Sequence, residues 1–281
     1  MRRSARHAAA FALLVAGGCG AGVSQSAAPP VAAQAGVLPA AARWVPAAGS
    51  SYQIQYDGNL DTAIAADSYD LDAFDTPAAA IARLHAQGRH AVCYVDVGTW
   101  ERWRPDAKDF PKSVLGKPDG GWPGERWLDI RQTSILEPIM AKRYDMCESK
   151  GFDAIDPDNI DGYTNETGFP LTAAEQLVYG AWVAQAAHRR GLSVAQKNDN
   201  GQVAQIAKLF DFGVVEQCFV QHWCGQFAGY TSRGALVVDV EYGLKPQRFR
   251  AETCPSDARY AETAILKRLA LTAWIVTCAS P

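Results

Sequence analysis

Short runs of apolar, β-branched and aromatic residues recur along the chain from residue 52 onward, separated by polar sequence. Runs of this kind, bounded by Gly, Pro, Asp or Asn, are typical of buried β-strands. Eight of them predict strands, at Tyr52–Tyr56, Tyr69–Phe74, Ala91–Asp96, Trp127–Ile130, Phe152–Asp156, Ser193–Lys197, Gly213–Gln217 and Leu236–Glu241.

Between these runs lie stretches whose apolar residues follow helical spacing. Alternating strands and helices predict parallel strands with crossover helices, and eight repeats favour a closed (β/α)8 barrel of the TIM type over an open doubly wound sheet. The connections 57–68 and 97–126 lack helical spacing, so we expect an incomplete helical ring with irregular loops. The predicted helices are Pro77–Gln87, Ile135–Lys150, Ala173–Arg190, Gln202–Leu209 and Ala258–Leu271, three of them followed by Gly88, Gly151 or Gly191 as stops.

The first 19 residues have a different pattern. Arg2, Arg3 and Arg6 precede an apolar run at 8–16, and small residues lead to Cys19. This order is typical of a secretory signal peptide. Its end resembles a bacterial lipobox, which makes lipid attachment at Cys19 a hypothesis and ordinary cleavage the alternative. Residues 20–42 are rich in Ala, Pro, Gly, Ser and Gln without any charge, a composition that predicts a disordered tether.

Residues 43–281 contain no second linker and are long enough for one large domain. The formal net charge is -3 and the basic residues are scattered, so nucleic acid is not an expected partner. No segment after the leader has about 20 consecutive apolar residues. We therefore expect a secreted or surface-tethered monomer that meets the membrane only through a lipid on Cys19.

The chain has seven cysteines, and setting Cys19 aside leaves six. An even number in an exported chain suggests three disulfides, although six cysteines allow fifteen pairings. A Cys-rich metal site is not favoured, because no C-x2-C occurs and the five His residues show no ligand spacing. We favour Cys218–Cys224 within one loop, Cys93–Cys147 between a strand and a helix, and Cys254–Cys278 around the predicted C-terminal helix.

Polar residues follow most of the predicted strands. In a (β/α)8 barrel the carboxyl ends of the strands converge at one face, where active sites are built. A single Asp there often only caps a turn or helix, but a whole ring of carboxylates repels itself unless sugar hydroxyls or a cation bind there. The candidate binding residues at this face are Tyr56, Asp57, Asp96, Asp156, Asp161, Lys197, Asn198 and Asp239.

Aromatic residues accompany these polar positions. Tyr52, Tyr94 and Trp127 lie within strand-like runs and are expected to pack in the core. Trp100 and Tyr163 fall in presumed loops, where flat rings suit the apolar faces of sugars. A polysaccharide is therefore the expected partner.

Four segments, in this order, resemble glycoside hydrolase family 114, the endo-α-1,4-polygalactosaminidases. They are residues 52–58 (YQIQYDG), 93–98 (CYVDVG), 151–163 (GFDAIDPDNIDGY) and 215–218 (VEQC). The resemblance spans 44–242 and implies a (β/α)8 fold that cleaves within chains of α-1,4-linked galactosamine. The family pattern G-F-D-G-V-x-x-D-x-x-D puts acidic positions on Asp158 and Asp161 and a variable one on Asp156, while Glu216 matches a later family Glu.

Glycosidic cleavage agrees with this match, since it needs one carboxylate at the anomeric carbon and one carboxylic acid that protonates the leaving oxygen. We expect Asp158 to be the nucleophile and Glu216 the acid/base, with apolar Val214 and Val215 nearby to raise the pKa of Glu216. Asp161 and the other acids would hold hydroxyls or ammonium groups. Lys197 and Asn198 would orient a carboxylate or a sugar oxygen, or Lys197 would form a structural salt bridge. No cofactor is expected.

Two other readings remain open from the sequence. Asp156 and Asp158 could be the metal-binding acids of a nucleotide-sugar transferase, although such sugars are scarce outside the cell. Alternatively, the chain could be a lipid-anchored protein that binds polysaccharide without cleaving it. A deacetylase is disfavoured by the lack of a His-based metal site.

Overall fold

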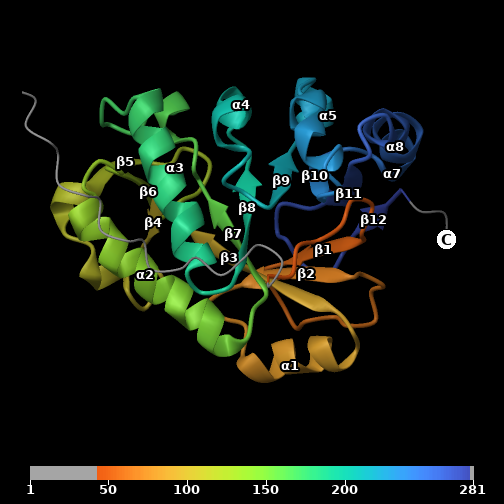
Figure 1. Ribbon diagram of the computed structural model, residues 1–281, viewed down its shortest axis with the longest axis horizontal. Coiled ribbons are helices and arrows are strands. Elements are labelled where there is room, and N and C mark those ends of the chain that lie inside the picture. Colours follow the sequence, from red (N-terminus) through yellow and green to blue (C-terminus); the bar gives the residue numbers. More distant parts are fainter. Residues whose placement is uncertain (1–42, 279–281) are drawn as a thin grey trace, which may run out of the picture. The chain divides into compact units, whose positions relative to one another are not determined.

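The computed structural model describes residues 43–278, and Figure 1 shows its parallel strands with helices packed outside them. The predicted signal peptide, Cys19 and the predicted tether lie outside the described residues. Eight parallel strands follow one another in chain order and form a (β/α)8 barrel of the TIM type, as predicted. They are β1 Tyr52–Gln55, β2 Ser68–Asp72, β3 His90–Asp96, β7 Ala154–Asp158, β8 Ser193–Lys197, β9 Phe212–Glu216, β10 Val237–Tyr242 and β11 Thr263–Lys267, with the short β12 Val276–Thr277 antiparallel to β11.

Two predicted elements were wrong. The run at Trp127 is not a barrel strand but part of β6 (Glu125–Leu128), the centre of a separate antiparallel sheet between β4 (Thr99–Glu101) and β5 (Leu115–Pro118). The predicted helix Ala258–Leu271 instead contains β11, the eighth barrel strand, which pairs with β10. A short apolar run such as TAILK fits either helix or strand, and burial beside β10 decides for the strand.

The ring of helices is incomplete, as expected. Three long helices, α1 to α3, cover the outside of the barrel. After β8, α4, α5 and α6 are single turns, whereas the π-helical residues Phe249–Thr253 join α7 and α8 into one continuous helical stretch. α2 ends at Gly151, whose φ of 90° lies in the left-handed region, where glycine is favoured at a helix C-terminus. No helix among residues 43–278 is long and apolar enough to cross a membrane. The helices are α1 Ala78–Ala86, α2 Thr133–Lys150, α3 Ala173–His188, α4 Val203–Ile206, α5 Cys218–Gln221, α6 Ala228–Thr231, α7 Pro246–Arg248 and α8 Cys254–Ala258.

The interior of the barrel follows the two-residue period of a strand. One side chain in two points inward, and these form a buried apolar cluster distinct from the one beneath the outer helices. Between β11 and β1, Lys267 Nζ donates to Gln53 Oε1 at 3.0 Å, and Tyr56 N donates to Leu271 O at 2.9 Å. The inward cluster contains Tyr52, Ile54, Val92, Ala154, Ala195, Phe212, Val214, Val238, Val240 and Ile265.

All three predicted disulfides are present. Cys93–Cys147 joins β3 to α2, Cys218–Cys224 closes a loop beside α5, and Cys254–Cys278 joins α8 to the end of the described chain. The last pair does not bracket a helix, because β11 lies between its cysteines. Three disulfides are typical of proteins that fold in an oxidising compartment.

We predict that Cys93→Ser/Cys147→Ser costs more stability than Cys218→Ser/Cys224→Ser. The first bond closes a loop of 54 residues and the second a loop of 6, so chain entropy gives about 4 and about 2 kcal/mol, respectively. Denaturant unfolding of both double variants would measure the difference. Equal losses, or a larger loss from the short loop, would contradict this origin of the stabilisation.

Candidate active site

Every second side chain of a strand points into the barrel, and this alternation continues to the carboxyl ends of the strands. Polar side chains therefore meet at one mouth of the barrel. On β7, the inward residue Ala154 is followed at every second position by Asp156 and Asp158. Glu216 ends β9 two positions after inward Val214, and Tyr242 ends β10 two positions after inward Val240. A cleft with a volume of about 520 Å³ opens here. It is lined on the barrel side by Tyr56, Asp57, Tyr94, Asp158, Asn159, Asp161, Lys197, Asn198, Glu216, Gln217 and Tyr242.

Lys197 is the centre of the site. Its Nζ lies 3.1 Å from Asp158 Oδ1, 3.5 Å from Glu216 Oε2 and 3.8 Å from Asp156 Oδ2, and its side chain is only 4% exposed. Burial disfavours the ammonium form, but the carboxylates of Asp158, Glu216 and Asp156 outweigh it and raise the pKa of Lys197 well above its usual value. The ammonium group therefore stays charged and holds both predicted catalytic residues.

These distances limit how far apart the two carboxylates can be. The Asp158 and Glu216 oxygens that contact Lys197 are separated by no more than the sum of their two distances, about 6.6 Å. Retaining glycosidases have carboxyl groups about 5 to 5.5 Å apart and inverting ones about 6.5 to 9.5 Å. This bound, which applies to one oxygen of each carboxylate, admits the whole retaining range.

Asp158 is held from two further directions. Tyr94 Oη donates to its Oδ2 at 2.8 Å, and the backbone N–H of Asn159 donates to its Oδ1 at 3.0 Å. The backbone of Asn159 approaches Gly98 so closely that a Cβ at position 98 would lie 1.7 Å from its carbonyl oxygen. The glycine at the exit of β3 is thus required for the loop that carries Asp158.

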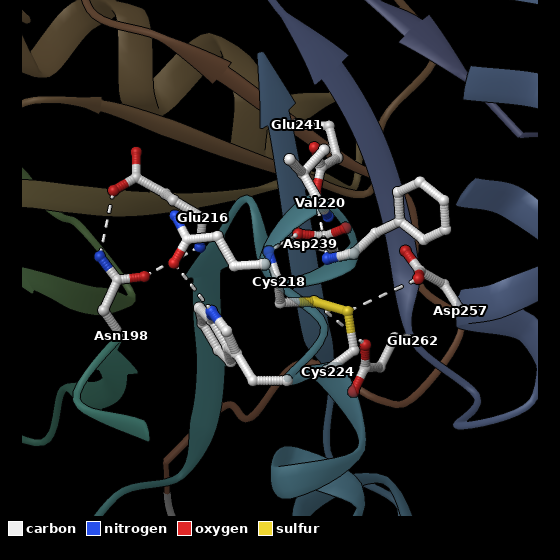
Figure 2. Close-up of a disulfide and its surroundings, with 12 residues drawn as sticks. Asn198, Glu216, Cys218, Val220, Cys224, Asp239, Glu241, Asp257 and Glu262 are labelled. Carbon is white, nitrogen blue, oxygen red and sulfur yellow. Dashed lines mark hydrogen bonds between the residues drawn. A yellow bond between two sulfur atoms is a disulfide. The ribbon is translucent and has the colours of Figure 1, made fainter. Parts of the chain in front are cut away.

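Glu216 has its own partners. Tyr242 Oη donates to Oε1 at 2.8 Å, and Asn198 Nδ2 donates to Oε2 at 3.1 Å while Asn198 Oδ1 accepts from the Glu216 N–H at 2.8 Å. Figure 2 shows Asn198 and Glu216 together on one side of Cys218. The side chain of Glu216 is 30% exposed, so one carboxylate is fixed in the site and still open to the cleft.

A second pair of acids lies one inward layer deeper. Asp156 is fully buried, and its charge acts on Asp70 of β2 at short range. Tyr56 Oη contacts both, at 3.1 Å from Asp70 and 3.4 Å from Asp156. Burial, followed by the charge of Asp156, raises the pKa of Asp70 well above its usual range, and burial raises that of Asp156 to about 6. This pair supports Lys197 from below and does not reach the cleft.

The other predicted binding residues divide into two groups. Asp57 and Asp161 line the cleft, together with Tyr56, Lys197 and Asn198. Asp96 does not, since it is buried and accepts from Asn159 Nδ2 at 3.0 Å. Trp100 Nε1 donates to Ala107 O, and Tyr163 Oη donates to Asp199 Oδ1, both away from the lining. These three position loops around the mouth.

Asp239 also lies elsewhere than predicted. Its neighbours Val238 and Val240 point into the barrel, so Asp239 points outward, where its Oδ1 accepts from the Cys218 N–H at 3.1 Å. Figure 2 shows it with Asp257 on the opposite side of Cys218 from Glu216. The two-residue alternation along β10 was the available signal that separates it from the inward acids.

Several lining residues were missed by the sequence analysis. Tyr94 was expected in the core but contacts Asp158, and Trp127 was also placed in the core but lines the cleft. Much of the remaining wall comes from the inserted sheet β4–β6 and its loops, which no barrel pattern predicts. The missed residues are Glu101, Arg104, Asp119 and Glu125, with residues 269–271 after β11, whereas Trp103 and Trp122, expected as sugar-binding aromatics of loops, and Asp72 and Asp75, expected at the end of the second strand, do line the cleft.

The residues present do not suit a metal bound by Asp156 and Asp158. The ammonium group of Lys197 contacts both carboxylates and would repel a divalent cation between them. Another group of potential ligands, Cys218, Cys224 and Asp239, contains a disulfide, so it offers no thiolates. The sugar-transferase alternative therefore loses the metal site on which it depends.

A TIM-type barrel that holds two carboxylates open to a cleft at its carboxyl face is the architecture of a glycoside hydrolase. A family model agrees: glycoside-hydrolase family GH114 matches residues 33–281, and the chain belongs to this family. The predicted family and enzyme class are confirmed. No curated protein matched the chain.

Solved structures give the same result. The crystal structure of Aspergillus fumigatus Ega3 in complex with galactosamine shares 34% identity, covers 84% of this chain and 97% of that chain, and superposes with a TM-score of 0.79. The glycoside hydrolase domain of PelA from Pseudomonas aeruginosa shares 16% identity over 81% of this chain and 98% of that chain, with a TM-score of 0.63. The second likeness supports the fold alone.

Three buried acids outside the barrel, Asp239, Asp257 and Glu262, should make the stability of the fold depend on pH. Burial raises the pKa of Asp257 to about 7 and that of Glu262 to about 8, and it also raises the pKa of Asp239. The folded state therefore binds protons that the unfolded chain has released above about pH 5, so stability falls as pH rises from 5 to 8. Each proton contributes a slope of about 1.4 kcal/mol per pH unit.

We expect Asp257→Asn, a neutral side chain of the same shape, to reduce this loss between pH 5 and pH 7 by about 1 to 2 kcal/mol. Denaturant unfolding at several pH values would measure it, with Glu166→Gln as an exposed control. If the variant and the wild type lose stability in parallel, the acid does not titrate as described.

Proposed function

We propose that the protein is an exported endo-glycosidase that cleaves α-1,4-linked galactosamine polymers with retention at the anomeric carbon. The observation that carries this proposal is the contact of one buried ammonium group, Lys197, with both Asp158 and Glu216 at the mouth of the barrel. The limit of about 6.6 Å that these contacts set between two carboxylate oxygens is compatible with retaining hydrolysis. Export is supported by the signal-like leader and by three disulfides.

In the first step, Asp158 attacks the anomeric carbon and Glu216 gives its proton to the departing oxygen, which forms a covalent glycosyl-enzyme. In the second step, Glu216 takes a proton from water as the water attacks the anomeric carbon and Asp158 departs. Tyr94 and Lys197 orient Asp158, and Tyr242 and Asn198 fix the carboxyl of Glu216. Its remaining exposed surface faces the cleft, where the leaving oxygen would lie.

The charge of the cleft supports a cationic substrate. Its lining has many carboxylates and only two basic residues, Arg104 and Lys197, both of which already contact acids. The excess of negative charge favours ammonium groups over neutral or anionic sugars. Ega3, whose structure contains galactosamine, is similar over nearly its whole length.

We predict that Asp158→Asn and Glu216→Gln each lower kcat by about 10³-fold, because each removes a proton-transfer or bond-forming group and keeps its shape. Release of reducing ends from deacetylated α-1,4-galactosamine polymer would measure the loss. Asp145→Asn and Glu252→Gln, at exposed ion pairs with Arg190 and Arg248, are matched controls.

Near wild-type rates in both catalytic variants would remove the two-carboxylate assignment. Binding of the polymer by the wild type without any release of reducing ends would identify a binding protein instead. NMR of the first products gives the stereochemistry, and a first-formed β anomer would contradict retention.

We also predict that KM for the deacetylated polymer rises several-fold between about 0.05 and 0.5 M salt, because ions screen attraction between exposed charges. A fully N-acetylated polymer is the neutral control, and its KM or binding constant should change little. An equal response of both polymers, or none, would count against a cationic substrate.

A further inference from the structure

The inserted sheet places one carboxyl group in the wall of the cleft without a counter-charge. Glu125 begins β6, its residue is 7% exposed, and it lines the same cleft as Asp158. Among residues 43–278, its side chain has one hydrogen-bond partner, the neutral hydroxyl of Thr99, whose oxygen lies 3.0 Å from Glu125 Oε2 and whose single proton is shared between Glu125 and Asp96. A carboxylate this buried ordinarily has a cation beside it.

The neighbouring acids of the wall do have one. Arg104 lies 2.7 Å from Glu101 and 2.6 Å from Asp72, and a second arginine, Arg143, lies 3.9 Å from Glu101. Arg104 thus forms ion pairs with two carboxylates, one of which, Glu101, lies opposite Glu125 in the pairing of β4 with β6. No basic side chain of the described residues forms an ion pair with Glu125, and because Glu125 lines the cleft, a cation bound there can reach it.

The surroundings of Glu125 are suited to a sugar. Trp103 and Trp122 are 52% and 46% exposed although both are large and apolar, and Trp127, two positions along β6, lines the same cleft. Exposed tryptophan faces bind the apolar faces of sugar rings and also attract cations. An aromatic surface beside an uncompensated carboxylate is a combination that fits a ring carrying an ammonium group.

We propose that Glu125 binds the ammonium group of an amino-sugar residue next to the catalytic centre and thereby selects free amines over N-acetylated residues at that subsite. The assignment depends on the proposed function for the reaction and adds the residue that determines specificity. A free amine forms a charge-assisted hydrogen bond with the carboxylate. An acetamido group has no charge, has one N–H to donate, and fills the space beside the carboxylate with a methyl group.

The raised pKa of Glu125 is consistent with this role. Burial, together with the nearby charges of Glu101 and Asp158, raises the pKa of Glu125 to about 7. The groups that face it are acidic on every side: Glu101 from β4, Asp158 from β7 and Asp119 from the preceding loop, with Asp96 of β3 reached through Thr99. A bound ammonium group would lower this pKa and release a proton, so binding of the amine should strengthen as pH rises towards 7.

The test is Glu125→Gln, which keeps the shape and an oxygen that can accept from Thr99. The substrate is a partially N-acetylated α-1,4-galactosamine polymer, and the products are sequenced by mass spectrometry. For the wild type we expect free amines to be enriched at one fixed position relative to the cleaved bond. For the variant we expect this enrichment to disappear and KM for the deacetylated polymer to rise about 10-fold, with a smaller effect on kcat.

Three controls separate the outcomes. Glu252→Gln, an exposed Glu that pairs with Arg248, should retain both the enrichment and KM. Glu125→Asp should recover part of the enrichment, which a merely structural carboxyl would not do. Thermal unfolding shows whether Glu125→Gln is folded, and if it is not, Glu125→Asp replaces it, with a weakened enrichment as the expected result and an unchanged enrichment and KM as the result that would overturn the proposal.

Failure of this inference differs from failure of the proposed function. If the wild type cleaves the polymer and Glu125→Gln gives the same acetylation pattern and the same KM, Glu125 does not bind the amine of the substrate. If the wild type releases no products, the proposed reaction is wrong. In that case binding of deacetylated and acetylated oligomers to wild type and Glu125→Gln still decides the subsite, and equal affinities would overturn it.

Discussion

The site depends on a single buried ammonium group. Lys197 on β8 lies among three carboxylates from the strands on either side, β7 and β9. Two of these carboxylates belong to the proposed catalytic residues. Without this positive charge, Asp156, Asp158 and Glu216 would repel one another within a few ångströms in a poorly solvated space. With it, both catalytic acids keep a fixed position at the mouth of the barrel. Tyr94 holds Asp158 further, and Tyr242 and Asn198 hold Glu216.

Acids occur in three different settings in this fold, and each setting gives them a different use. Those at the inward strand ends are partly exposed and contact Lys197, which suits reaction with a substrate. Those one layer deeper, Asp70 and Asp156, are buried with raised pKa values and support the layer above. Those on the outward face of β10 cap α5, where Glu241 Oε1 accepts from the N–H groups of Phe219 and Val220.

The cleft is lined by two different parts of the fold, the barrel and the inserted sheet. The barrel supplies the catalytic acids on rigid strands, while the insertion β4–β6 supplies a wall of tryptophans and carboxylates. Rigid strand ends suit residues that must be placed within a fraction of an ångström, and loops and inserted sheets suit contacts that distinguish one substrate from another. This division explains why an enzyme of a common fold can have a cleft with its own charge pattern.

The sequence by itself determined seven of the eight barrel strands, the three long helices, the disulfide pairs and the family. Each rests on local patterns: alternating burial, helical spacing, glycine stops and ordered motifs. The sequence also predicted that Asp158, Glu216 and Lys197 lie close together, because the carboxyl ends of barrel strands share one face. The sequence could not identify β11, since TAILK fits helix and strand equally until β10 lies beside it.

Only the tertiary structure decided which acids face the cleft and which are paired. Asp239 and Glu216 look alike in sequence, but the phase of each strand turns one outward and the other inward. Arg104 is three residues from Glu101 and 32 from Asp72, yet it neutralises both, which leaves Glu125 without a cation. Charge compensation depends on distances in space between segments far apart in the chain, and no local pattern encodes those distances.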